Sequence, residues 1–454
     1  MRLETLTDRL RDVASGGRPV SGRAPAANQA GAPLGNVGHD GEDAEDHLAR
    51  RARLHAVLGG EWQTSGSARW LVIEHREHRD RRHGSSRIGD LADVLDAAAG
   101  CAPLLTGGAV ATAPFLFVDL ETTGLSGGAG TYAFLIGVGC FDEQGDFVTR
   151  QHVLDRLADE RLLLQSVADD LSAAGALVSF NGKSFDLPLL ETRFHYHRLP
   201  WTCDRLPHVD VLHPARRFWR SDPRAVHLDE PTCSLGALER SVLGAKRDDD
   251  IPGLEAPGRY FQFLRSGDAG PLAGVLAHNR VDLLSLAGLT VRLLRLLDVG
   301  VNEARTMREA VALGRLYERA GLPGRAVNAY EGALRLEQPG EGVVVRTVLR
   351  VDALRALALL ARRSRRYLDA AARWRDVLRV PMCPPAVARE AAEALAIHHE
   401  HRQRDLQSAH TFALRTLDGP LAASRRDAAC RRVSRLERKL SEAHSGALRL
   451  QLGD

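Results

Sequence analysis

The stretch Phe115-Leu-Phe-Val-Asp-Leu-Glu-Thr-Thr-Gly124 is the strongest indication of fold in this 454-residue chain. Its apolar residues predict a buried strand, and because side chains alternate along a strand, Asp119 and Glu121 lie on one face. Two carboxylates on such a strand lose hydration and repel each other, and a divalent cation offsets both costs. Asp-x-Glu also occurs on solvated edge strands, but the Thr-Thr-Gly turn that follows at once favours a functional site.

Short β-rich runs and helical periods alternate around this strand over residues 111–300. The runs YAFLIGVGCF, FVTRQHVL and ALVSF predict further strands, and the pattern over about residues 159–173 predicts a helix. Three early antiparallel strands followed by a helix and a strand indicate an α/β domain, with a mixed central sheet flanked by helices.

The remaining chain divides into four regions. Residues 1–14 predict a short N-terminal helix, and residues 15–48, rich in Gly, Ala and Pro, predict a flexible linker. Residues 49–110 predict a small mixed lead-in region with a strand at Arg69–Glu74, and residues 305–445 predict an all-α region.

The helical region repeats itself. A shift of 44 residues superposes Ala326 on Ala370 and Tyr330 on Trp374, and a third, looser copy begins at Ala394. Small residues and aromatics at this spacing are typical of TPR-like helical hairpins. We therefore expect an all-α TPR-like helical-repeat domain, closed by a basic C-terminal helix.

Composition narrows the class of protein. The formal net charge of +3 does not by itself indicate nucleic acid as a partner. The chain has no apolar stretch of about 18 residues or more, and its first residues are charged, so neither a membrane span nor a signal peptide is predicted. Its six cysteines form no CxxC pair, which argues against a disulfide framework and a zinc ribbon. These features predict a cytoplasmic protein.

Two histidine-rich runs invite a metal interpretation. His75, His78 and His83 lie in HREHRDRRHG, whose spacing matches no strong zinc pattern, so a solvated or phosphate-facing basic loop is favoured. His398–His401 falls inside the third helical copy, where a plain repeat helix is favoured.

Two later motifs complete an ordered set. Val178-Ser-Phe-Asn-Gly-Lys-Ser-Phe-Asp186 follows a predicted strand, and His278-Asn-Arg-Val-Asp282 lies on a predicted helix, where positions i and i+4 share a face. With VDLETTG in front of them, these motifs resemble those of the DEDD exonucleases of the RNase H-like superfamily, the DnaQ-like enzymes.

This resemblance implies an RNase H-like fold and a catalytic set of Asp119, Glu121, Asp186, His278 and Asp282. Its four carboxylates would be the ligands of two Mg²⁺ or Mn²⁺ ions. His278 stands four positions before Asp282, the spacing of the Tyr-bearing branch of that family, whereas the His-bearing branch has five.

Other stretches narrow the resemblance. The ordered runs GTYAFLIGVG, RDDDIPG at Arg247–Gly253 and YFQFL, together with the helical tail, are similar to bacterial proteins of the YprB type, in which an RNase H-like exonuclease domain is fused to TPR-like repeats.

Several residues beside the motifs are candidates for substrate contact. Phe218 and Trp219 either stack on a base or pack beneath a helix, and Asp210 is either an acid behind the site or a cap. The expected substrate-binding residues are Thr122, Asn181, Lys183, Phe185, Arg216 and Arg217.

The sequence therefore predicts a metal-dependent 3′–5′ exonuclease that cuts single-stranded DNA or RNA ends by a two-metal-ion mechanism, with the polarity implied by the resemblance. Water would be the nucleophile and His278 its general base. The helical tail is expected to bind a protein partner or guide the substrate. A non-catalytic nucleic-acid-binding module, a scaffold built on the repeats and a phosphodiesterase for very short oligonucleotides remain as alternatives.

Overall fold

The computed structural model describes residues 44–66, 68–124, 130–220, 233–247, 250–336, 342–419 and 422–451. The helix predicted over residues 1–14 and the predicted linker up to residue 43 lie outside these ranges. Residues 44–48, predicted as linker, are helical instead, because helix α2 spans Ala44–Leu58. The sheet and the helices that follow it belong to one unit, Arg50–Asp454.

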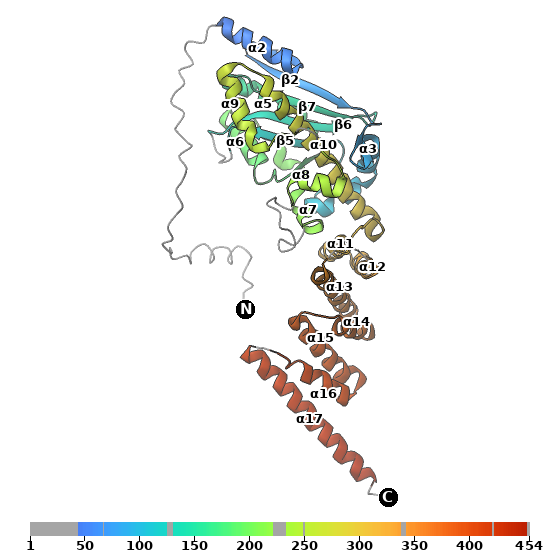
Figure 1. Cartoon of the computed structure of the whole chain (residues 1–454). Helices are drawn as coiled ribbons and strands as arrows, with labels where there is room; N and C mark the ends of the chain where they lie inside the picture. The colour runs from blue at the N-terminus through green and yellow to red at the C-terminus, as the bar shows by residue number, and fades with distance from the viewer. Residues whose placement is uncertain are drawn as a thin grey trace, which may run out of the picture. The chain divides into compact units, whose positions relative to one another are not determined.

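The central layer of this unit is a mixed seven-stranded sheet in the order β1-β2-β7-β6-β5-β8-β9 (Figure 1). Neighbouring strands are antiparallel from β1 to β5, and β5, β8 and β9 are parallel, which confirms the predicted mixed sheet. The strands are β1 Glu61–Ser65, β2 Ala68–Glu77, β5 Phe115–Thr122, β6 Ala133–Phe141, β7 Phe147–Val153, β8 Ala176–Ser179 and β9 His208–Asp210, and a separate hairpin pairs β3 Arg82–His83 with β4 Ser86–Arg87.

The lead-in region predicted over residues 49–110 is not separate from the sheet. Its predicted strand is β2, which pairs with β7, and β1 extends the sheet beyond it. The histidine-rich run that follows is not a loop throughout either, since His75 lies within β2 and His83 within β3.

Helix α10 crosses the sheet over β5, β6 and β7 (Figure 1). Pro271 stands in its first turn, where a missing N–H costs no hydrogen bond, and most of its residues are buried. Helix α10 spans Gly270–Val299. Between α2 and α10 lie α3 Ile88–Ala98, α4 Pro103–Thr106, α5 Glu160–Ser172, α6 Asp186–Tyr196, α7 Leu212–Phe218, α8 Leu235–Leu238 and α9 Ala256–Ser266.

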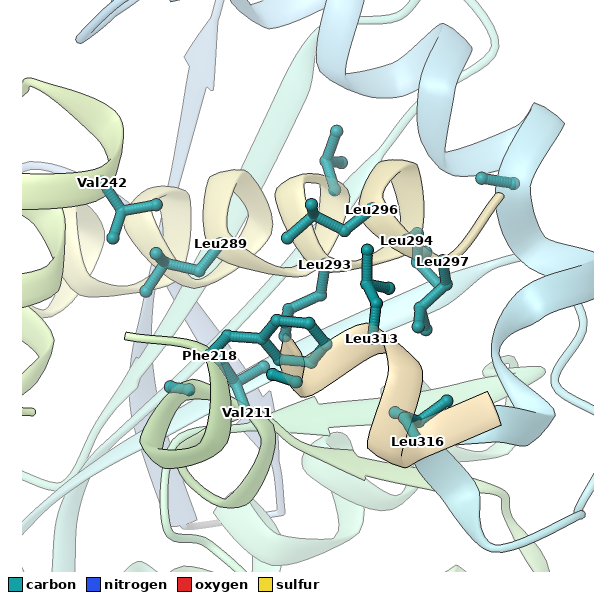
Figure 2. Packing of buried hydrophobic residues seen from close by; sticks show 14 of the residues in the cluster. Val211, Phe218, Val242, Leu289, Leu293, Leu294, Leu296, Leu297, Leu313 and Leu316 are labelled. Carbon is teal, nitrogen blue, oxygen red and sulfur yellow. The ribbon is translucent and has the colours of Figure 1, made fainter. Parts of the chain in front are cut away.

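The hydrophobic core continues from the sheet into the helical tail. Leu289 and Leu293 of α10 pack with Phe218 of α7 and with Leu313 and Leu316 of the next helix, α11 (Figure 2). The first tail helices therefore share a core with the sheet.

The tail consists of helical hairpins, which confirms the predicted helical domain. The positions aligned by the 44-residue shift, Ala326 with Ala370 and Tyr330 with Trp374, are all buried. The third, looser copy starts at Ala394 inside α15, as the first copy starts at Ala312 inside α11. The helices are α11 Met307–Arg319, α12 Pro323–Arg335, α13 Val343–Arg363, α14 Tyr367–Arg379, α15 Pro385–His398, α16 Leu406–Arg415 and α17 Ala423–Gln451.

The histidines of the third hairpin do not continue a plain helix. α15 ends at His398, and a π-helical turn spans His399–Gln403. His398 and His399 are buried there, and the ring of His399 stacks on Phe412. Among the described helices, none has the length and apolarity needed to cross a bilayer.

Candidate active site

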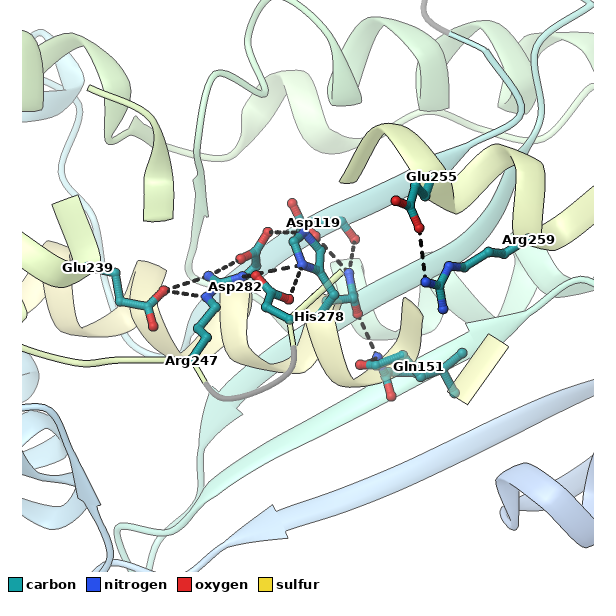
Figure 3. Close-up of polar contacts among 11 residues, drawn as sticks. Asp119, Gln151, Glu239, Arg247, Glu255, Arg259, His278 and Asp282 are labelled. Atoms are coloured by element: carbon teal, nitrogen blue, oxygen red, sulfur yellow. Dashed lines mark hydrogen bonds and ion pairs between the residues drawn. The ribbon is translucent and has the colours of Figure 1, made fainter. Parts of the chain in front are cut away.

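A row of three residues on neighbouring strands positions the site under α10. Asp119 on β5 pairs in register with Gly137 on β6, which pairs with Gln151 on β7. Asn279 of α10 lies over this row, where its Nδ2 donates to Asp119 Oδ2 at 2.8 Å and its Oδ1 accepts from Gln151 Nε2 at 2.8 Å (Figure 3). A Cβ atom at position 137 would lie 2.1 Å from Asn279 Oδ1, so glycine is the residue that permits this approach.

Four carboxylates converge from three elements. Asp119 and Glu121 stand on β5, Asp186 in the first turn of α6, and Asp282 on α10. Burial, followed by the charges of the other three, raises the pKa of Asp119 well above its ordinary value. Burial also raises the pKa of Asp282. The four side chains predicted as metal ligands thus lie within electrostatic reach of one another.

The pKa values of two further carboxyl groups are shifted by the same causes. Burial, opposed by His278 and reinforced by Asp282 and Asp186, raises the pKa of Glu121 to about 7. Burial and the charge of Asp210 raise the pKa of Asp186 to about 7. The acidic side chains of the site therefore outnumber the basic side chains that pair with them, which favours the binding of a cation.

Arg247 supplies positive charge at one side of the site (Figure 3). Its guanidinium pairs with Asp282, donates through Nε to Glu239 Oε2 at 2.7 Å and lies 3.1 Å from Asp250 Oδ2. Against the effect of burial, Asp282 and Glu239 raise the pKa of Arg247. This arginine therefore stays charged among three acids.

His278 lies between two carboxylates. Its Nδ1 is 2.7 Å from Asp250 Oδ1, and its Nε2 is 3.5 Å from Asp282 Oδ2. The predicted proximity of His278 and Asp282 on one helix face is present. Asp250 fixes the orientation of the ring from the opposite side.

Asp210 is a backbone cap for the loop of the second motif. Its Oδ1 accepts from the Asn181 N–H at 2.8 Å and the Leu212 N–H at 3.2 Å, and its Oδ2 accepts from the Lys183 N–H at 3.1 Å. Asn181 has a φ of 67°, a left-handed conformation that this capping sustains. The loop leads directly into Asp186 and so positions that carboxylate.

The predicted substrate-binding residues fall into two groups. Lys183 is exposed in the loop before Asp186, and the Phe185 side chain is 58% exposed beside it. Thr122 follows the acidic strand, and its hydroxyl donates to the Gly124 carbonyl at 2.9 Å. Together with Asn181, these residues border the carboxylates.

Arg216 and Arg217 form the second group, at the end of α7, which lies against α11. Burial and the nearby charge of Arg217 lower the pKa of Arg319 on α11. Phe218 is buried in the core, and Trp219 donates through Nε1 to Glu309 at 2.7 Å. Phe218 therefore packs in the core and is not available to stack on a base, and the Trp219 indole is bound at the junction with the tail.

Sequence reasoning missed five residues that organise the site. Arg247 and Asp250 belong to the RDDDIPG run, whose acids following an arginine were a usable signal. Asn279 adjoins His278, but Glu239 and Gln151 stand in stretches without any local signal. Gln151 acts through Asn279, which is 128 residues away, and Glu239 acts through Arg247, eight residues away in a stretch of no regular period.

The donor chemistry of the site fits a hard divalent ion. Carboxylate oxygens are the preferred ligands of Mg²⁺ and Mn²⁺, and the surplus negative charge favours such an ion. Within the ranges that the structure describes, however, no three His, Cys, Asp or Glu side chains are already gathered closely enough to hold an ion. This holds for the histidine-rich runs as well, where the described side chains form no such group.

Two comparisons with known proteins match this arrangement. The family model described as RNase_H superfamily matches residues 116–294, which extend from β5 into α10 and include all three acidic motifs. The chain is 30% identical over 384 residues to the Bacillus subtilis (strain 168) protein YprB, which is itself described as uncharacterized. The aligned part covers 82% of this chain and 86% of that protein, and so extends beyond the matched domain.

Proposed function

Because the chain belongs to the RNase H-like YprB family, we propose that it is a divalent-metal-dependent nuclease that removes nucleotides from the 3′ ends of single-stranded DNA or RNA. The observation that carries this proposal is the convergence of four half-buried carboxylates whose loss of hydration and nearby charges raise their pKa values. Such a cluster is costly in a protein core unless a cation joins it, and perturbed carboxylates in this arrangement are typical of functional sites.

Each side chain has a part in the proposed reaction. Two Mg²⁺ or Mn²⁺ ions, held by the four carboxylates, would neutralise the charge of the scissile phosphate and lower the pKa of a bound water. His278 accepts the proton of the attacking water, and Asp250 holds its ring through Nδ1 so that Nε2 faces Asp282. Asn279 keeps Asp119 in place through their 2.8 Å hydrogen bond.

The exposed residues beside the carboxylates suit a nucleic-acid end. Phe185 offers an aromatic face on which a terminal base can stack, and Lys183 offers a cation for a phosphate. In this proposal the helical tail guides the strand or binds a protein partner. The protein acts in the cytoplasm.

The test is degradation of 5′-labelled single-stranded DNA and RNA in Mg²⁺ or Mn²⁺. Wild-type protein is expected to give a ladder of shortened labelled products, because cleavage from the 3′ end leaves the label on the longer fragment. Asp119→Asn and Asp186→Asn remove one ligand each and should abolish the ladder. Asp96→Asn, the same change on an exposed position of α3, should leave it intact.

Two other results would redirect the assignment. Binding of the labelled strands by all four proteins without cleavage would indicate a non-catalytic nucleic-acid-binding module. Cleavage confined to oligonucleotides of a few residues would indicate a phosphodiesterase for short fragments.

A further inference from the structure

Arg247 contacts Asp282, a proposed metal ligand, and also three residues that are not proposed ligands. Its Nη2 pairs with both Asp282 and Glu239, and its Nη1 lies 3.1 Å from Asp250 and 3.3 Å from Nδ1 of His278. One guanidinium therefore bridges three carboxylates at the edge of the cluster and lies beside the His278 ring (Figure 3).

Glu239 gives the guanidinium an anchor that does not depend on Asp282. This glutamate is 1% exposed, and among the described residues its Oε1 has no hydrogen-bond partner. A buried carboxylate needs a counter-charge, and Arg247 provides it through Nε and Nη2. The guanidinium can thus keep its bond to Glu239 when its bond to Asp282 is broken.

Both oxygens of Asp282 already have partners. Oδ1 accepts from Arg247, and Oδ2 faces Nε2 of His278 at 3.5 Å. An ion that binds this carboxylate competes with both partners for its lone pairs and its negative charge. The arginine is the stronger competitor, because a guanidinium is always charged.

We propose that Arg247 is a built-in counter-cation, which holds Asp282 in the metal-free protein and gives it up to a divalent ion while remaining bound to Glu239. This proposal rests on the proposed function, because it takes Asp282 as a metal ligand.

The proposal predicts that removing the arginine charge tightens metal binding. Manganese alone is titrated into the full-length protein by calorimetry, for the wild type and for Arg247→Gln combined with Glu239→Gln. The double variant removes both members of the buried pair, so no unpaired buried glutamate remains. It should bind Mn²⁺ on the order of tenfold more tightly, since a bond to a charged group no longer has to be broken.

Two further variants complete the design. Arg247→Lys keeps the positive charge and should bind Mn²⁺ with less than about threefold change, because a lysine ammonium still competes for the carboxylate. Arg259→Gln removes an arginine that pairs with Glu255 outside the cluster and should leave the affinity unchanged. Circular dichroism of each variant reports whether its secondary structure is that of the wild type.

Equal or weaker Mn²⁺ binding by a natively folded double variant would overturn the proposal for Arg247. If the wild type also binds Mn²⁺ and degrades labelled strands, the nuclease proposal survives that result. If neither protein binds Mn²⁺ and no strand is cut, both proposals fail.

Discussion

Replacing Asp186 with asparagine is expected to stabilise the metal-free protein as the pH rises. Burial and the charge of Asp210 raise the pKa of Asp186 from 3.8 to about 7, so the folded protein holds a proton that the unfolded chain releases. The free-energy cost of ionising Asp186 in the folded protein is absent below the pKa of the unfolded chain. It grows as the pH rises above that value and is complete above the pKa of the folded protein. Asparagine carries no charge and avoids this cost.

The size of the effect follows from the two pKa values. A difference of about three pH units corresponds to roughly 4 kcal/mol, at ~1.36 kcal/mol per unit. The backbone N–H groups at the start of α6 lower the pKa of Asp186, and the value of about 7 already includes their effect. The gain expected for Asp186→Asn at pH 8 is therefore about 4 kcal/mol, and it should be nearly absent at pH 4.

Urea denaturation in the presence of EDTA, at pH 4 and pH 8, measures this gain. Asp96→Asn serves as the control, since Asp96 is exposed on α3 and its replacement should change the free energy of unfolding by less than about 0.5 kcal/mol. An Asp186→Asn protein that is equally or less stable than the wild type at pH 8 would refute the conclusion that ionised Asp186 destabilises the folded protein. Added Mn²⁺ should reverse the order of stability, because the wild type binds the ion more tightly.

Two further substitutions test the packing around the site. Gly137→Ala should destabilise the fold by about 1–3 kcal/mol and lower nuclease activity, because its Cβ would displace Asn279; Gly100→Ala, which meets no atom within 4 Å, should change neither. An active Gly137→Ala protein of normal stability would contradict the close contact. Glu309→Ala should cost about 3 kcal/mol in urea denaturation, because this buried carboxylate accepts hydrogen bonds from the Arg292 guanidinium, the Arg305 backbone N–H and the Trp219 indole at the junction with the tail. Glu255→Ala, an exposed pair partner, should cost less than about 1 kcal/mol, and equal losses would show that the junction does not depend on the buried pair.

The parts of the fold that the sequence predicted rest on local rules. Alternation along Phe115–Thr122 placed Asp119 and Glu121 on one face, and the i, i+4 spacing placed His278 beside Asp282, because both periods are properties of the backbone itself. The strands from β5 to β8 and the helical tail followed from the same periodicities, and the order of the acidic motifs indicated the family.

Which segments of the chain contact each other at the site could be learned from the tertiary structure alone. The residues that surround Asp282 and Asp119 come from different elements: Arg247 and Glu239 from the segment before α9, and Gln151 from β7. The order of strands places Gly137 between β5 and β7, so that Asn279 can reach both neighbours. The contacts of Asn279 with Gln151 and Asp119 join residues 128 and 160 positions apart, and Arg247 reaches Asp282 across 35 positions. They depend on strand pairing and helix packing, and no local period of the sequence encodes them.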